Sequence, residues 1–488
     1  MKAGRDSQTT AAWRLAEKQA RAALPVALPL LVGLALRLWL LRCLFNVDGD
    51  SLVYGGIAKN LLLHGRYALT SPGGAIEPTL IRLPGYPLFL ALCFKLFGME
   101  NYFAATVAQI AFDLLGVLLV AAFVRRICPE PIGRVAAQAA LWLAALCPFT
   151  ASYTTIPLPE SLTLTTIALA MWAVARFQDD PGWTHALWFT LAVTAATLLR
   201  PDGALVAVAF VPALLPGRGS RRRKNAAPLP RFLRMAAVCT LLALLPFAVW
   251  AGRNWRVFHV FQPLAPRLAN NPNEPTYPGW ERWVKSWCLD FQSTYEVYWN
   301  VPGGELDLSV LPRRAFDTPA ERAATMTLVD NYNRSAMELT PAIDAGFAQL
   351  GRQRIAADPL RFYLWLPLGR VADMWLRPRV ENLPIDLDWW VYAHHGQETD
   401  FSWAYAGLNV LYLLLAAVGL AMRPRLWRSF LAYLLLRSAL LLSVTAPETR
   451  YTIECFPMLF ALGGIALGRL LYRQNARKHL PPANLELP

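Results

Sequence analysis

The sequence predicts an all-α polytopic membrane protein, with about ten transmembrane helices and a mixed extracytoplasmic domain. Its 488 residues are 55% hydrophobic and only 16% charged, and the mean hydropathy is positive. These values lie outside the range of an ordinary soluble domain. Apolar runs long enough to cross a bilayer as helices recur along the chain. We expect spans at residues 22–45, 102–124, 134–154, 159–176, 185–200, 203–216, 232–252, 402–422, 426–445 and 452–472.

The basic residues predict the orientation of these spans rather than a nucleic-acid partner. A net charge of +14 and a pI near 9.7 would suit nucleic acid, but Lys and Arg gather between the apolar runs. Cytoplasmic loops of membrane proteins carry such an excess of positive charge. Both termini are therefore expected in the cytoplasm. The basic positions are Arg125, Arg126, Arg134, Arg218, Arg221 to Lys224, Arg423, Arg425, Arg428, Arg473, Arg477 and Lys478.

The spans divide the chain into a core, an outer segment and a C-terminal part. The outer segment is rich in Trp, Pro, Tyr and Asn, which fits a small folded domain better than a flexible linker. Its apolar run 362–376 contains Arg370 and Asp373, and we expect an interfacial helix there because a span would reverse the basic loops that follow. The predicted parts are a transmembrane core at 1–252 with the first outer loop at 46–101, an extracytoplasmic domain at 253–401, C-terminal helices at 402–475 and a cytoplasmic tail at 476–488.

The stretch Asp48–Tyr67, DGDSLVYGGIAKNLLLHGRY, predicts a short amphipathic helix just after the first span. From Ser51 onward, apolar residues recur at three- and four-residue spacing, which places them on one face of a helix lying on the bilayer surface. Gly65 is a C-terminal stop signal. Asp50 stands where an N-cap would, and Asp is a favoured N-cap residue. It is therefore either a cap or a chemical group.

Charged residues gather on the outer side from four separate turns. Each one alone has a structural interpretation, because a carboxylate at a helix end is commonly a cap and an interfacial Arg commonly reaches for lipid headgroups. Together they offer a carboxylate that can take a proton and several fixed cations that can hold a phosphate. The candidates are Asp48, Asp50 and Arg82 in the first outer loop, Glu160, Arg200 with Asp202, and Glu448, Arg450 and Tyr451 near the C-terminus.

The order of the motifs on this side resembles that of a known family. They are D-x-x-x-Y beginning at Asp50, HGRY, RLPGYPLF from Arg82, P-x-x-E ending at Glu160, LLRPDG around Arg200 and PETRY from Pro447. The series looks like the GT-C superfamily of polyprenyl-phosphate-sugar-dependent glycosyltransferases. It is most similar to the bacterial branch related to protein O-mannosyltransferases and to the aminoarabinose transferase of lipid A. The resemblance covers residues 30–215 well and the C-terminal part more loosely.

The resemblance implies an inverting transferase whose active site faces the outer side of a bacterial cytoplasmic membrane. Its donor would be a sugar linked to a polyprenyl phosphate, its acceptor a glycan, lipid or protein, and membrane lipids would surround it. Asp50 matches the catalytic carboxylate of the first loop and Glu160 a second one, and Asp48 stays open as the base because relatives often carry an adjacent acidic pair. The implied donor-phosphate contacts are Arg82, Arg200, Arg450 and Tyr451, and the other pocket residues are Tyr54, Tyr86, Asp202 and Glu448.

The sequence leaves a metal or other cofactor undetermined. A divalent metal is compatible with the carboxylates, but no His and Asp cluster has convincing ligand spacing, and His394-His395 is expected to be a surface pair. The seven cysteines have no C-x-x-C spacing, which predicts neither a disulfide framework nor a zinc site. Arg37 and Asp113, inside the first and second spans, are the costliest charges in the membrane and are expected to pair.

Two other functions stay open from the sequence. A transporter or flippase of lipid-linked sugars would also need cations beside an apolar groove, although its polar groups should follow a path through the midplane. A non-catalytic assembly protein would use the Trp-rich outer segment to bind partners. The predicted site charges lie on one side only, which favours the enzyme.

Overall fold

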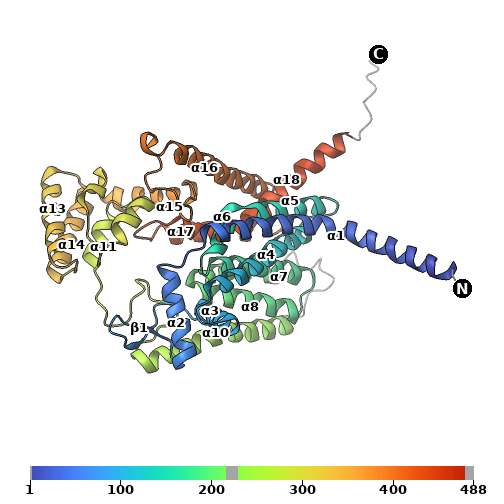
Figure 1. Cartoon of the computed structure of the whole chain (residues 1–488), viewed down its shortest axis with the longest axis horizontal. Helices are drawn as coiled ribbons and strands as arrows, with labels where there is room; N and C mark the ends of the chain where they lie inside the picture. The colour runs from blue at the N-terminus through green and yellow to red at the C-terminus, as the bar shows by residue number, and fades with distance from the viewer. Residues whose placement is uncertain (1–2, 216–228, 479–488) are drawn as a thin grey trace, which may run out of the picture.

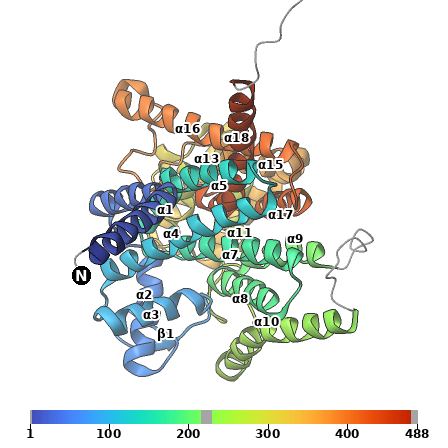
Figure 2. The same cartoon turned by 90° about the vertical axis from the view of Figure 1, so that its right-hand side faces the viewer.

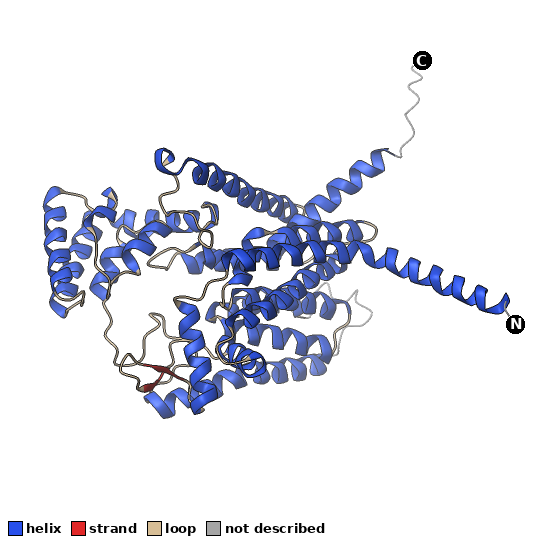
Figure 3. Ribbon diagram, in the orientation of Figure 1, coloured by secondary structure: helices blue, strands red, loops and turns tan. Residues whose placement is uncertain are grey.

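The computed structural model describes residues 3–215 and 229–478, and the regular secondary structure within these is almost entirely helical. Two short strands, β1 (Ala68–Thr70) and β2 (Ile76–Pro78), pair antiparallel. Figure 3 shows how small this sheet is beside the helices. The predicted all-α class is confirmed. The basic positions Arg218 and Arg221 to Lys224 lie outside the described residues, as does most of the predicted tail.

Each of the ten expected spans coincides with a helix. These are α1 (Ala3–Leu44), α4 (Tyr102–Ile127), α5 (Ile132–Leu146) with α6 (Pro148–Ser152), α7 (Glu160–Asp179), α8 (Trp183–Leu199), α9 (Leu205–Leu214), α10 (Leu229–Phe258), α16 (Tyr392–Ala421), α17 (Trp427–Leu441) and α18 (Phe456–Lys478). Among the described residues, five helices are long and apolar enough to cross a membrane, or six if the bent pair Ile132–Leu146 and Pro148–Thr155 is one span. The protein is a multi-pass membrane protein. The number ten stays a prediction, because helices such as α8 are apolar but short.

The buried core of the bundle lies where α4, α5, α7 and α18 pack against one another (Figure 2). Small residues allow α5 and α18 to approach closely. A Cβ at Gly468 would lie 2.4 Å from the Cα of Ala136, and one at Gly464 would lie 2.5 Å from the Cβ of Ala140. These distances leave no room for a side chain. Because lipid is as apolar as the helices, such close packing of backbones is what holds them together.

The first outer loop contains α2 (Asp50–His64) and α3 (Gly85–Phe97). The predicted apolar face of α2 is buried, and Tyr54 on this face is only 8% exposed. Tyr54 packs against Tyr86 of α3, which offers a complementary apolar face, and the position of α2 at the bilayer surface stays a prediction. Gly65 ends α2 in the left-handed conformation, as predicted.

The outer segment is a helical unit with its own core. Trp283 and Trp287 are at most 1% exposed, and the ring centroids of Trp283 and Phe347 lie 4.9 Å apart. Within residues 253–401 the structure is helical rather than mixed, since both strands belong to the first outer loop. The helices are α11 (Pro278–Lys285), α12 (Phe291–Ser293), α13 (Pro319–Arg334), α14 (Pro341–Ala357) and α15 (Leu366–Leu376), with short 3₁₀ or π turns at Thr294–Tyr298, Leu308–Val310, Arg313–Ala315 and Arg361–Trp365.

The run 362–376 forms the π turn Arg361–Trp365 and α15. Tyr363 and Trp365 are 70% and 63% exposed, whereas Arg370 is fully buried and donates from Nε to the carbonyl oxygen of Cys288 at 2.8 Å. The apolar side chains thus face outward and the charge faces the protein. This pattern fits the predicted interfacial helix, because such a helix presents its apolar face to lipid.

The arrangement of the ends agrees with the predicted topology. In Figure 1, α11, α13 and α14 lie at one end of the molecule, and α1 begins and α18 ends at the opposite end. The labels α2 and β1 of the first outer loop lie toward the same end as the outer segment. The start of α1 and the end of α18 therefore lie on the same side, and the assignment of that side to the cytoplasm stays a prediction.

A buried ion pair joins α1 to α4, as predicted. Arg37 Nε donates to Asp113 Oδ2 at 2.6 Å, and both side chains are at most 5% exposed. Arg37 Nη1 also donates to the backbone oxygens of Gly33 and Ala145, both at 2.9 Å. Because Ala145 belongs to α5, the one guanidinium connects three helices.

We predict that Arg37→Ala and Asp113→Ala each lower the free energy of unfolding by about 3–5 kcal/mol, because either change leaves a buried charge without its partner. The swap of Arg37→Asp with Asp113→Arg should recover part of this loss. Recovery is partial because a transposed arginine does not meet the same backbone oxygens. Thermal unfolding of the purified protein in detergent measures the effect, and a swap no more stable than the single variants would contradict it.

Candidate active site

Asp50, Arg82 and Arg450 meet although they come from distant parts of the chain. Asp50 is the first residue of α2, Arg82 precedes α3, and Arg450 lies in the 3₁₀ turn η8 (Thr449–Cys455) before α18. Arg82 Nη2 lies 2.6 Å from Asp50 Oδ1, and Arg450 Nη1 lies 3.1 Å from Asp50 Oδ2. Each carboxylate oxygen therefore has its own arginine.

The local backbone shows that Asp50 is not the N-cap residue of α2. Gly49 takes the N-cap position with φ +46°, a conformation that glycine adopts readily. The cap interpretation of Asp50 is therefore wrong, and its carboxylate is available for the arginines. Burial raises the pKa of Asp50, but Arg450 and Arg82 outweigh it and bring the pKa below the ordinary value of 3.8. Asp50 is ionised at neutral pH.

Arg450 is shared with a second carboxylate. Its Nε forms an ion pair with Glu448 Oε2, and the hydroxyl of Tyr451 donates to Glu448 Oε1. Glu448 is only 4% exposed, and burial raises its pKa while Arg450 offsets this in part. Within the PETRY motif, Glu448 thus fixes the position of Arg450, which contacts Asp50.

Glu160, Arg200 and Glu454 form a more deeply buried cluster. Arg200 Nη1 donates to Glu160 Oε1 at 2.7 Å, and Arg200 Nε lies 2.6 Å from Glu454 Oε1. Asp202 lies 3.5 Å from Arg200 Nε and pairs with Arg437, whose Nη1 is also 3.0 Å from Glu454 Oε2. Glu160, Glu454 and Arg437 are 0% exposed. Two arginines therefore hold three carboxylates.

Tyr451 connects the two clusters into one outer network. The guanidinium carbon of Arg200 lies 5.9 Å from the Tyr451 ring centroid, and Arg437 Nε donates to the Tyr451 backbone oxygen at 2.7 Å. The outer network contains five carboxylates and four arginines, so its formal charge is −1. Its members are Asp50, Glu160, Asp202, Glu448, Glu454, Arg82, Arg200, Arg437 and Arg450. Near-complete pairing is what allows so many charges to stay buried, because an unpaired one would cost several kcal/mol.

The remaining predicted residues lie beside the network or outside it. Asp48 is exposed and accepts from Asn46 Nδ2 at 2.6 Å, so of the two aspartates only Asp50 contacts the arginines. The Tyr54 ring lies 5.7 Å from the Arg82 guanidinium carbon, and Tyr86 packs on Tyr54 with centroids 5.1 Å apart. The two tyrosines therefore support Arg82 from the protein side.

Two members of the network were not predicted from the sequence. Arg437 and Glu454 stand inside the apolar runs LLLRSALL and YTIECFPM. A charge inside a span is itself a signal, because such residues face the bundle interior and pair. The same rule that predicted the pairing of Arg37 with Asp113 would have found both in the last two spans.

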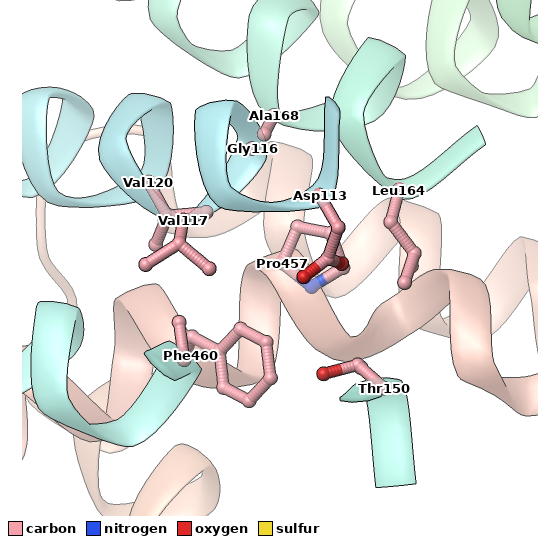
Figure 4. A pocket seen from close by; sticks show the side chains of 10 residues that line it. Asp113, Gly116, Val117, Val120, Thr150, Leu164, Ala168, Pro457 and Phe460 are labelled. Atoms are coloured by element: carbon pink, nitrogen blue, oxygen red, sulfur yellow. The ribbon is translucent and has the colours of Figure 1, made fainter. Parts of the chain in front are cut away.

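A small cavity lies deeper in the bundle, among the described residues. Its volume is about 20 Å³, room for one water molecule. Figure 4 shows Asp113, Thr150 and Phe460 around it. The lining includes no residue of the outer network. This cavity is therefore separate from the outer network.

The carboxylates of the outer network face arginines. Arg200 lies between Glu160 and Glu454, and Asp50 is held on both oxygens. Among the described residues, the groups of His, Cys, Asp and Glu with converging ligand atoms lie elsewhere, at residues 386–398. The side chains that the outer network presents for binding therefore fit an anionic group better than a metal ion.

The comparison with protein families bears directly on this part of the chain. Residues 78–250 match the family model of dolichyl-phosphate-mannose-protein mannosyltransferase. The match confirms, over these residues, the predicted relation to polyprenyl-phosphate-sugar-dependent membrane glycosyltransferases. It contains Arg82, Glu160 and Arg200, whereas Asp50 and Arg450 lie outside it and are brought to the site by their contacts alone. No curated protein matches the sequence.

Two solved structures of one bacterial protein are similar to the chain along most of its length. ArnT from Cupriavidus metallidurans bound to undecaprenyl phosphate aligns with 15% identity and a TM-score of 0.40, covering 95% of this chain and 82% of that one. The same protein in the apo state aligns with 16% identity and a TM-score of 0.36, covering 96% and 82%. The likeness is distant, and it places no individual residue.

We predict that Arg200→Ala lowers the free energy of unfolding by about 3–5 kcal/mol, because Glu160 then stays buried without a cation while Glu454 keeps only Arg437. Adding Glu160→Gln removes the carboxylate that has lost its cation and should recover part of the loss. Thermal unfolding in detergent compares these variants with Arg66→Ala, a change of an exposed arginine in the first outer loop. Equal stability of Arg200→Ala and Arg66→Ala would show that the cluster does not hold the helices together.

Proposed function

We propose that the chain is an integral membrane glycosyltransferase that moves a sugar from a polyprenyl-phosphate carrier to an acceptor. The transfer takes place on the extracytoplasmic side of a bacterial cytoplasmic membrane, and the acceptor is a glycan, a lipid or a protein. The observation that carries the proposal is the ionised Asp50 held between Arg82 and Arg450. The family match over residues 78–250 supports this class of reaction.

Arg82 and Arg450 hold the phosphate of the carrier in this proposal. A guanidinium presents a planar fork of N–H donors that matches two phosphate oxygens. The two side chains are 21% and 22% exposed, so a headgroup can reach them, whereas Arg437 is sealed in the bundle. As the bond from the sugar to the phosphate breaks, negative charge grows on the phosphate, and fixed arginines stabilise it.

Asp50 is the general base in the same step. The acceptor O–H or N–H gives its proton to Asp50 as its oxygen or nitrogen bonds to the anomeric carbon, and the bond from that carbon to the phosphate oxygen breaks. Protonation removes the charge of Asp50 while the phosphate gains one. Arg82 and Arg450 then exchange one anion for another, so the total charge at the site does not change. Sharing the same arginines therefore couples the base to the leaving group.

Glu160 orients the acceptor. Its Oε1 accepts from Arg200, while its Oε2 is buried and has no hydrogen-bond partner among the described residues. A buried carboxylate oxygen without a partner is costly. Glu160 is fully buried, so in this proposal the network opens around it, and an acceptor hydroxyl or amine that then reaches this oxygen satisfies it and is held close to the network. Asp202 and Tyr451 keep Arg200 in place for this role.

We predict that Asp50→Asn folds and inserts normally but lowers the rate of transfer by about 10²–10⁴-fold, the usual contribution of general-base catalysis. The amide keeps the shape of the side chain and removes its basicity. The measurement is transfer of labelled sugar from a polyprenyl-phosphate donor in membranes that contain the variant.

Asp48→Asn is the matched control, because Asp48 is exposed and lies two positions away. Near-normal transfer is expected from it. The reverse order of the two variants would make Asp48 the base, and unchanged transfer in both would remove the first outer loop from the chemistry. If the purified protein moves labelled lipid-linked sugar across vesicles without consuming it, the flippase alternative holds instead.

The lowered pKa of Asp50 predicts a shift of the pH profile in an arginine variant. Transfer needs the carboxylate, so wild-type activity should fall through this group only below about pH 4, near the ordinary pKa of an aspartate. Arg82→Gln removes one of the two cations that lower the pKa, so the acid limb should move to higher pH. The rate relative to its own plateau is measured against pH. Arg66→Gln, which changes an exposed arginine, is the control. If the acid limb of Arg82→Gln lies at the same pH as the acid limb of Arg66→Gln, the proposed role of Arg82 is contradicted.

A further inference from the structure

A second cluster of reactive side chains lies in the strap, residues 377–398, which leads from α15 into α16. Two groups of three converge there. They are Asp388 with His394 and His395, and Asp386 with His395 and Glu398. Within each group, one ligand atom from every residue lies within 4.8 Å of the others. His395 belongs to both groups and stands at their centre.

The first group has the composition of a transition-metal site. Two imidazoles and one carboxylate are a familiar set of three protein ligands for zinc, with the fourth position left to water or another ligand. Tetrahedral zinc with bonds of about 2.0–2.1 Å places neighbouring ligand atoms about 3.3 Å apart. His395 Nε2 lies 3.1 Å from Asp388 Oδ1, close to that separation.

The second group supplies the support that such a ligand needs. His395 Nδ1 lies 3.4 Å from Asp386 Oδ2. One imidazole cannot bind a single ion through both nitrogens, so a metal on Nε2 leaves the Nδ1–H facing Asp386. A carboxylate in this position fixes the tautomer and raises the basicity of the ligating nitrogen. Asp386 is itself held, because its backbone N–H donates to Glu398 Oε2 at 2.9 Å.

The backbone bends where these ligands stand. His395 is a non-helical residue inside α16, with φ −130° and ψ 43°. The N–H groups of His394 and His395 both reach the carbonyl oxygen of Val391, at 3.0 and 3.1 Å. Successive residues of a regular helix point about 100° apart. The bend is therefore what allows two adjacent imidazoles to join one ligand set.

A protonated His395 between two aspartates would give the same two distances without a metal. This alternative leaves the position of His394 unexplained. Asp388 would already be paired with the charged His395, so a second imidazole would gain no attraction from that carboxylate. We propose that Asp388, His394 and His395 bind one divalent transition metal of the zinc class, with Asp386 orienting His395. The expected surface pair His394-His395 is then half of a binding site, and His395 is only 19% exposed.

The metal would hold the strap against the turn that carries Arg450. Arg379 of the strap donates from Nη1 to the backbone oxygen of Thr449 at 3.0 Å, and Glu381 accepts from the hydroxyl of Tyr153 at 2.8 Å. An ion near the α16 end of the strap restricts its motion there. The role is positional, and it does not depend on the proposed transfer reaction.

The experiment counts metal on the untagged full-length protein in detergent after treatment with a chelator. Zinc is titrated in competition with a chromophoric chelator, and we expect one tightly bound zinc per chain. Asp388→Asn and His395→Ala should weaken binding by at least about 10-fold, and Asp386→Asn by about 10–100-fold as a supporting residue. His64→Ala, which changes an exposed histidine on α2, should bind zinc like the wild type.

Hydrogen exchange supplies a second readout that needs no activity. Zinc should slow amide exchange in residues 378–398 of the wild type and of His64→Ala, and should not do so in Asp388→Asn. The carboxylate variants change half-exposed or exposed side chains, so folding should persist, and thermal unfolding without zinc checks this. Absence of tight zinc binding, or equal binding by Asp388→Asn and His64→Ala, would overturn the proposal.

Discussion

Asp50 divides its two oxygens between Arg82 and Arg450, and this pairing can form only when three parts of the fold are in place. The first outer loop supplies two of the residues, and the turn before the last helix supplies the third. At the edge of a membrane protein, an arginine without an anion would be costly to bury, and so would the aspartate without a cation. The site is therefore complete only in the folded bundle.

The near neutrality of the outer network also constrains what it can bind. With five carboxylates against four arginines, the network has no spare positive charge at rest. A phosphate group gains arginine contacts only by sharing them with Asp50 or Glu448. Lysine would serve this exchange poorly, because arginine keeps its charge when buried and offers a fork that two anions can use at once. The use of arginine throughout the network follows from that requirement.

The sequence predicted helices well and pairings poorly, for a physical reason. Apolar runs specify a helix by themselves, so each expected span coincides with one. The pair Arg37 and Asp113 was predictable because each is a lone charge in a span, and a lone charge has few partners available. Asp50 and Arg82 belong to a surface rich in charges, where several partners are chemically equivalent. The fold alone decides among them.

Local geometry distinguishes two residues that the spacing in the sequence treats alike. Asp48 and Asp50 are alike as residue types, and only the turn at Gly49 turns one toward Asn46 and the other toward the arginines. The sequence predicted the apolar face of α2. It did not predict that this face packs against α3, because lipid and α3 are equally apolar. Arg437 and Glu454 were missed although each is a single charge in an apolar run, the same signal that predicted the pair of Arg37 and Asp113.

The outer segment holds the turn that contains Arg450, and so it cannot be separated from the site. Lys285 Nζ donates to the backbone oxygen of Ser443 at 2.9 Å, and Thr294 Oγ1 donates to that of Pro447 at 2.9 Å. Arg379 does the same for Thr449. Removing the outer segment would leave these oxygens without protein donors and free the turn to move. A truncated chain that lost transfer would therefore say nothing about where the acceptor binds, whereas single changes of exposed residues in this segment would.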